Sequence, residues 1–446
     1  MTATAKNTAV FMPQQAAKPE ALAWLANAGA QALPAGAPDW VAALRQTAHE
    51  SFAATGLPAA NQEGWQFTNL RGLDAAAYRH AAPVAVADVK NLPAALLADS
   101  YRLVLVNGQY CEALSVLPQG AKVAPILSVE SIVPNAREYL LGLGDLTANP
   151  FKALTSAHLR DGFAFALDRG QVLDKPLEVL FWGEAGQAAY PRVLYWLGEN
   201  AQATILERFC GQGASFTSAL TDIVLQQRAH LTYHRLVEEG EKASHFSQTS
   251  VHSLKDSHFD AYNGALGGGL QRQGYEFKLL EKGIYSSLAG IYLKDGQQIQ
   301  DFTVLAGHYD ESGVSAQHFK GVVDDQARAV FQGKIHVHRS AQKTDGYQSH
   351  HALLLSQNCE ANAKPELEIY ADDVKCSHGA TAGQLDRNAL FYLRSRGISD
   401  HEARALLIRS FLSEGIEKIS NPDIRALYEA RIDAWLDARA HKKAAA

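Results

Sequence analysis

Short apolar runs separated by turn residues fill the middle of the chain. They have the length and the β-branched and aromatic content of strands. The runs cover residues 162–167, 177–182, 193–197, 203–209, 220–225, 231–237, 259–262, 275–280, 286–293, 302–306, 330–337 and 367–370. In one run Ile335 and Val337 fall on one face and His336 and His338 on the other, because strand side chains alternate. The pattern predicts a mainly β protein.

So many strands need a way to protect their edges from unwanted pairing. A sandwich, a barrel and a parallel β-helix all do this. Two-residue hairpin turns are scarce between the runs, and no repeat is regular enough to choose among the three. The apolar pattern alone therefore leaves these architectures open.

Near both ends of the sequence, the apolar residues follow helical spacing instead of strand alternation. Near the start, Trp40, Leu44, Ala48 and Phe52 follow helical spacing. Near the end, helices are expected over residues 385–396, 403–412 and 424–436, the second opened by a Ser399–Glu402 capping box and the third by Asn421–Pro422. The predicted domains are an N-terminal helical and mixed region, 1–155, a β core, 156–376, and a C-terminal helical domain, 377–446.

The charge and the cysteine content of the chain narrow the range of possible functions. The 446 residues include 41 Lys and Arg against 47 Asp and Glu, a formal charge of −6, and four cysteines. Nucleic acids and anionic membranes attract clustered basic residues, which this balance does not supply. Four scattered cysteines form no disulfide framework, and no signal peptide or membrane span is recognisable. We expect a soluble cytoplasmic protein that binds neither nucleic acid nor membrane.

Nucleotide chemistry has no motif to support it. The sequence contains no G-x-x-x-x-G-K-[ST], and the glycine-rich segment 264–269 lacks the Lys and hydroxyl that a phosphate and Mg²⁺ require. We interpret that segment as a turn. The chain is expected to bind no nucleotide of its own.

Histidine and aspartate pairs are weaker candidates for chemistry. His336 and His338 could take two positions on a metal, but no carboxylate follows at a suitable distance. His350 and His351 would point to opposite faces of a strand. The pairs 324–325 and 372–373 could serve a β-helix polysaccharide lyase or hydrolase, but turn and capping positions explain them as well. Surface or structural roles are the simpler interpretation for all of them.

The tripeptide Cys376-Ser377-His378 places two potentially reactive or metal-binding side chains close together. Residues two apart on a strand share a face, so the thiolate and the imidazole could bind one metal or act as nucleophile and base. A cluster usually needs four protein ligands, and no C-x-x-C is present. Any cluster at this site would borrow ligands from another chain.

This tripeptide lies in a longer segment, residues 364–381, which together with residues 391–397 closely resembles the C-terminal signature of the SufB/SufD family. Those proteins are scaffold subunits of the SUF iron–sulfur cluster assembly system. Supporting stretches are residues 63–70, 161–162 and 343–346. Having only four cysteines favours the SufD branch over the SufB branch.

The resemblance implies a right-handed parallel β-helix flanked by helical domains, and a non-catalytic role. It further implies a complex with SufB and the ATPase SufC, and a transient iron–sulfur cluster shared with SufB. His378 matches the position implicated in cluster assembly at that interface, and Cys376 is the second candidate ligand. Whether a reduced flavin of the complex contacts this subunit is left open, as is a homodimer in isolation.

The C-terminal helices are the expected SufC dock, because they carry more apolar residues than one end of a β-helix needs to cover. Leu407 and Phe411, four residues apart, are the chosen anchors. The alternative is that both are buried within the chain's own helical domain. A metal-free homodimeric β-helix adaptor is the remaining alternative for the whole protein.

Overall fold

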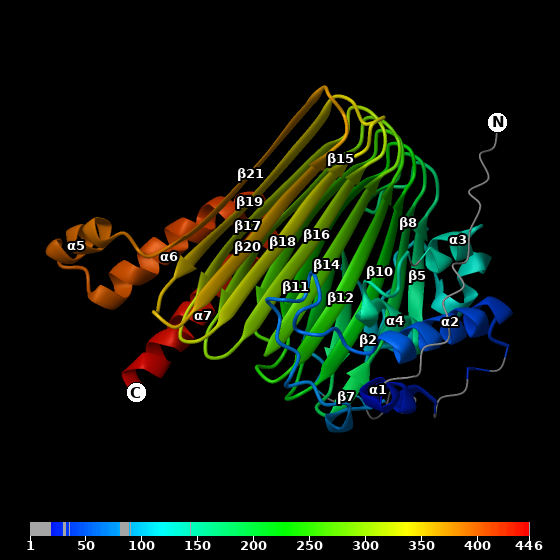
Figure 1. Ribbon diagram of the computed structural model, residues 1–446, viewed down its shortest axis with the longest axis horizontal. Helices are drawn as coiled ribbons and strands as arrows, with labels where there is room; N and C mark the ends of the chain where they lie inside the picture. The colour runs from blue at the N-terminus through cyan, green and yellow to red at the C-terminus, as the bar shows by residue number, and fades with distance from the viewer. Residues whose placement is uncertain are drawn as a thin grey trace.

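The computed structural model describes residues 19–29, 33–34, 36–80, 89, 91–142 and 144–445. Two long sheets form its centre (Figure 1). Sheet A runs in the order β20 (Glu360–Ile369), β18 (Arg328–Val337), β16 (Ile299–His308), β14 (Leu270–Leu279), β12 (Ser244–Ser253), β10 (Phe216–Leu225), β8 (Arg192–Leu197), β5 (Gly162–Leu167) and β4 (Lys122–Pro125), with β7 (Gln187–Ala189) and β1 (Arg79–His80) beside β10.

Sheet B holds the alternate strands of the chain. It runs in the order β21 (Val374–Gly383), β19 (Thr344–Leu354), β17 (Val314–Val323), β15 (Tyr285–Lys294), β13 (His258–Leu266), β11 (His230–Glu238), β9 (Gln202–Gly211), β6 (Leu177–Gly183), β2 (Tyr101–Val106) and β3 (Gln109–Tyr110). From β8 to β21 every described pair is parallel, and consecutive strands lie in different sheets. This is a parallel β-solenoid, which confirms the expected parallel β-helix core with flanking helices.

Each turn of the solenoid repeats at a nearly constant spacing, although the sequence shows no recognisable repeat. Ala203, Leu231 and Phe259 stand side by side in sheet B, and each is 28 residues from the next (231 − 203 and 259 − 231). At the corner before each strand of this sheet from β9 to β19, one residue has a positive φ. These residues are Asn200, Arg228, Asp256, Gly283, Ser312 and Lys343. One left-handed residue bends the chain from sheet A into sheet B, so hairpin turns are not needed there.

The interior between the sheets is filled by one side-chain parity of each strand. In β18 Phe331, Ile335 and Val337 are buried in the core, whereas His336 and His338 lie on the outer face. This confirms the alternation expected for residues 334–338. Four long strands, β12, β17, β19 and β21, lie where the apolar pattern predicted none, because polar residues occupy many of their positions.

Helices of the N-terminal region cover the outer face of sheet A at its early strands (Figure 1). They are α1 (Pro19–Gly29), α2 (Asp39–Thr55), α3 (Ala136–Leu141) and α4 (Pro150–Ala157), with short 3₁₀ turns at Ala75–Ala77, Glu112–Leu114 and Ile126–Ser131. Phe151 of α4 stacks on Phe246 of β12 with ring centroids 3.7 Å apart. This packing fixes the N-terminal region to the solenoid.

Three helices follow the solenoid: α5 (Arg387–Ser395), α6 (Asp400–Ile416) and α7 (Pro422–Ala445). The capping box of Ser399 and Glu402 and the N-cap at Asn421 are both present, as the sequence predicted. Helices α6 and α7 pack on the outer face of sheet B, whereas α5 projects away from the strands (Figure 1). None of the helices among the described residues is long and apolar enough to cross a membrane.

Candidate functional site

The solenoid ends at two strands that have a neighbour on one side only. β20 is the last strand of sheet A and β21 the last strand of sheet B in the part of the chain that the structure describes. Most of their side chains are half-buried or exposed, in contrast to the buried strands before them. The late end of the solenoid is therefore open.

Cys376 and His378 lie on β21 at this open end. Gly346 and Gln348 of β19 are their partners in the register. Gln348 is fully buried and Cys376 packs against the solenoid core, so this parity faces the interior. The structure thus brings the two predicted site residues onto one face, with His378 exposed where the next turn of the solenoid would lie.

The Cys376 thiol is half-buried, and desolvation raises its pKa. Its sulfur lies close to Gly346, where an added Cβ would be 3.2 Å away. A protonated thiol is a poor metal ligand and a poor nucleophile. In this chain alone, His378 is the more available ligand of the two.

The other candidate histidines are structural or lie on a surface. The His350 ring is buried and its Nε2 is 2.8 Å from the Tyr292 hydroxyl, while His351 on the opposite face has Nδ1 2.7 Å from Thr381 Oγ1. His336 and His338 stack with centroids 4.4 Å apart on the outer face of sheet A. Within the described residues, no group of three or more His, Cys, Asp or Glu side chains could hold a metal ion.

The aspartate and glycine segments adopt the simpler roles expected for them. Asp324 is buried and forms an ion pair with Arg439 of α7, and Asp325 has the positive φ of a turn residue. Gly267 and Gly268 also have positive φ and form the turn after β13. These segments serve the fold.

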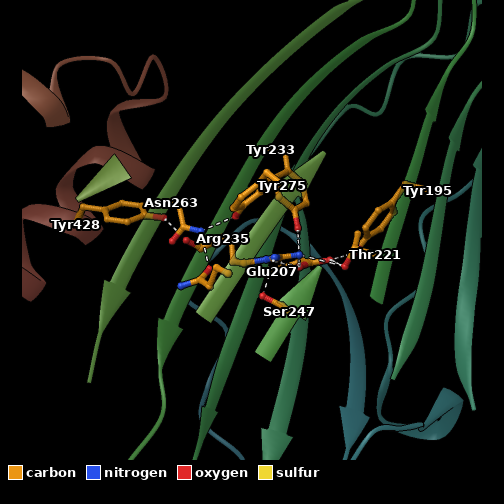
Figure 2. Close-up of polar contacts among 10 residues, drawn as sticks. Tyr195, Glu207, Thr221, Tyr233, Arg235, Ser247, Asn263, Tyr275 and Tyr428 are labelled. Carbon is orange, nitrogen blue, oxygen red and sulfur yellow. Dashed lines mark hydrogen bonds and ion pairs between the residues drawn. The ribbon is translucent and has the colours of Figure 1, made fainter. Parts of the chain in front are cut away.

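A buried ion pair inside the solenoid is the main polar feature that the sequence did not predict (Figure 2). The Arg235 guanidinium donates two hydrogen bonds to Glu207 Oε2, at 2.8 and 2.9 Å, and both side chains are fully buried. Further hydrogen bonds reach Tyr233, Thr221 and Ser247. A fully enclosed and well-partnered network of this kind stabilises and orders a core rather than binding a ligand.

The predicted partner-binding residues lie on α6, which packs on β15 and β17. Leu407 is half-buried. Phe411 packs against the hydrophobic cluster beneath α6, and the Lys320 ammonium lies 4.9 Å from its ring centroid. On α5, Phe391 and Tyr392 are more open, with 75% and 57% of their surface exposed.

Comparison with known families accounts for this architecture. Residues 19–179 match the SufBD protein N-terminal region, and residues 181–411 match the SufBD core domain of SUF system FeS cluster assembly. The chain belongs to the SufB/SufD family. This membership supports a role in iron–sulfur cluster assembly.

Individual relatives place the chain on the SufD branch of that family. It is 33% identical to the iron–sulfur cluster assembly protein SufD of Escherichia coli, over 85% of this chain and 89% of that protein. A SufBD family protein of Synechocystis is 32% identical over 84% of this chain and 86% of its own length. The chloroplastic protein ABCI7 of Arabidopsis thaliana is 30% identical over 70% of this chain and 68% of its own.

Proposed function

We propose that the chain is a non-catalytic scaffold for iron–sulfur cluster assembly in the cytosol. Its open solenoid end pairs with SufB, and His378 supplies one ligand to a cluster built at that interface. The observation that carries this proposal is the exposure of His378 on the terminal strand β21, beside Cys376. All four cysteines are free thiols, as a reducing compartment requires.

The cluster is cargo that passes through the interface, and its ligands must come from both subunits. A protein-bound cluster usually takes four protein ligands. His378 offers one, and the half-buried thiol of Cys376 offers a second only after it loses its proton. SufB therefore supplies the remaining ligands.

The pairing itself uses the unpaired edges of β20 and β21. Edge strands present free backbone N–H and C=O groups and readily pair with another chain. Ile369 and Tyr370, at the end of β20, are 38% and 59% exposed and add apolar surface to this edge. A second copy of the chain offers the same surface, so a homodimer in isolation follows from the same geometry.

An inward-facing charge at this edge tests the pairing. We expect Ile369→Lys to abolish co-purification with SufB, because a charge on an edge strand opposes strand pairing. Val172→Lys is the matched control, since Val172 is exposed far from the open end. Unchanged binding of SufB by Ile369→Lys, measured by size-exclusion chromatography with light scattering, would contradict pairing through this end.

The C-terminal helices are proposed to bind SufC. Leu407 and Phe411 remain the proposed anchors, although Phe411 already contacts the chain's own core. Phe391 and Tyr392 on the projecting helix α5 add exposed aromatic surface to the same helical domain. The ATPase would then act on the scaffold through helices that stand off the solenoid.

Two double variants separate docking from folding. Phe391→Asp with Tyr392→Asp is expected to remove SufC binding while SufB pairing and the far-UV circular dichroism spectrum stay unchanged. Leu407→Asp with Phe411→Asp supports the original anchors if it gives the same result. Aggregation of the second variant would assign those two residues to the chain's own core.

A further inference from the structure

A row of four aromatic rings crosses the outer face of sheet A near its late end. Tyr309 stacks on His338 with ring centroids 4.3 Å apart, and His338 stacks on His336 at 4.4 Å with an interplanar angle of 10°. The ring of Tyr370 follows, 5.6 Å from His336. The row holds two imidazoles side by side, and the function proposed above assigns no role to either of them.

The two histidines line an open pocket of about 480 Å³, together with Arg339, Tyr370 and Asp372. His336 lies on β18 and His338 directly follows that strand, so both side chains point to the same face of the sheet. Asp372 comes from the segment after β20, which is distant in sequence from the histidines. The fold therefore adds to the pocket a carboxylate that the sequence around the histidines lacks.

The imidazoles are held through their ring faces and not through their nitrogens. Among the described residues, none forms a hydrogen bond with a ring nitrogen of His336 or His338. An added Cβ at Gly307 would be 2.9 Å from Tyr309 Cε2, so the missing side chain lets the Tyr309 ring reach His338. Imidazole is the commonest metal ligand among protein side chains, and the nitrogens of this pair are available for that role.

Charge alone selects no ion at this pocket. Lys334 forms an ion pair with Glu368, whose carboxylate also accepts a hydrogen bond from the Tyr370 hydroxyl at 2.6 Å. Arg339 and Asp372 are both exposed and add one charge of each sign. Because these cations and anions are equal in number, the donor atoms must decide what binds. Imidazole nitrogens favour Zn²⁺ and Ni²⁺, whereas Mg²⁺ and Ca²⁺ prefer oxygen ligands.

We propose that His336 and His338 together bind one Zn²⁺ ion, or another divalent late first-row ion, on the outer face of the solenoid. Each Zn–N bond is about 2.0–2.1 Å long, so the two nitrogens need to be roughly 3.3 Å apart. Rings whose centroids are 4.4 Å apart reach that spacing with a small rotation. The described residues place no third protein donor, so water fills the remaining positions and Asp372 accepts a hydrogen bond from one such water. The proposal does not depend on cluster assembly.

Calorimetric titration of the purified full chain with Zn²⁺, in a buffer that does not bind metal, tests the site. We expect binding that His336→Gln and His338→Gln each weaken at least tenfold, because either variant leaves a single imidazole. Mg²⁺ should not bind, since it prefers oxygen ligands. His401→Gln, which removes an exposed histidine of α6, is the matched control and should bind Zn²⁺ like the wild type. Far-UV circular dichroism verifies that each variant is folded.

A further variant separates this pocket from the open end of the solenoid. Cys376→Ser with His378→Ala should still bind one Zn²⁺ with the wild-type affinity, and loss of binding there would place the ion on β21 and overturn the proposal. Arg339→Gln removes a cation from the pocket, so it should raise the affinity several-fold. A wild-type chain that does not bind Zn²⁺, or binding that either His336→Gln or His338→Gln leaves unchanged, would also overturn the proposal.

Discussion

A single charged residue, Arg235, shows how the solenoid tolerates polarity in its interior. Besides its ion pair with Glu207, its guanidinium lies 5.5–5.6 Å from the ring centroids of Phe209, Tyr233 and Tyr275. Tyr195 donates a further hydrogen bond to Glu207 at 3.0 Å (Figure 2). Every strong polar group of the pair therefore has a partner, which is the condition for burying charge without a large penalty.

Breaking that pair should be costly. Glu207→Ala leaves the Arg235 charge buried without its counter-ion, so we expect the free energy of unfolding to fall by about 3–5 kcal/mol. Urea denaturation measures this. Replacing both partners, by Glu207→Leu and Arg235→Met, should recover much of the loss because no charge remains buried. A single variant as stable as the wild type would mean that the pair is not closed in solution.

Buried neutral histidines make stability depend on pH. Burial lowers the pKa to about 4 for His234, His252, His308, His318 and His350. The unfolded chain has ordinary values near 6.5, so between pH 6.5 and 4 it binds more protons than the folded chain. The resulting stability is fully present above pH 6.5 and is lost as the pH falls toward 4.

His350→Gln isolates one of these groups. The unfolding free energy of this variant should depend on pH less steeply in that window, by up to about 1.4 kcal/mol per pH unit. Urea unfolding at several pH values between 6.5 and 4 provides the comparison with the wild type. An identical slope would mean that His350 takes up its proton equally in both states.

At the scale of elements, the docking of α7 on sheet B depends on one glycine. Tyr428 lies against Gly264 of β13, where an added Cβ would be 2.3 Å from Tyr428 Cε1. Its hydroxyl donates to the Arg235 carbonyl at 3.1 Å, and its ring packs edge-on to Tyr262 with centroids 4.9 Å apart. Gly264 therefore leaves the space in which Tyr428, from a helix distant in sequence, packs on the sheet.

A side chain at position 264 should weaken the packing of α7 on sheet B. We expect Gly264→Ala to lower the unfolding free energy by about 1–3 kcal/mol through overpacking. Faster amide hydrogen exchange in α7 than in β13 would locate the effect. Gly379→Ala is the matched control, because an added Cβ there meets nothing within 4 Å. Equal stability of the two variants would show that Tyr428 adjusts without cost.

The sequence predicted elements best where the signal is local. The capping box at Ser399 and the N-cap at Asn421 depend on residues three positions apart, and both were confirmed. Strand β12, with the sequence SHFSQTSVHS, was missed although nearly all of it is buried. Ser247 and Gln248 accept hydrogen bonds from Arg235 and Asn149, which are distant in sequence, and the backbone of β12 pairs with β10 and β14. These contacts exist only when the neighbouring turns of the solenoid are in place, and a local sequence pattern does not record them.

At the scale of the whole molecule, the two ends of the solenoid differ. The N-terminal helices cover the early strands, while β20 and β21 end the sheets without a neighbour among the described residues (Figure 1). Spacing alone could place Cys376 and His378 on one face, and the family signature singled them out. The Arg235 network could not be predicted, because it joins residues from several turns of the solenoid.

The iron and sulfide content of the chain co-expressed with SufB and SufC tests the central claim most directly. His378→Ala should leave the complex assembled but lower iron and sulfide per complex, because it removes one coordination bond and no packing contact. His401→Ala, an exposed histidine on α6, is the matched control and should match the wild type. Cys376→Ser should lower the content less than His378→Ala. Wild-type iron and sulfide in the His378→Ala complex would contradict the account.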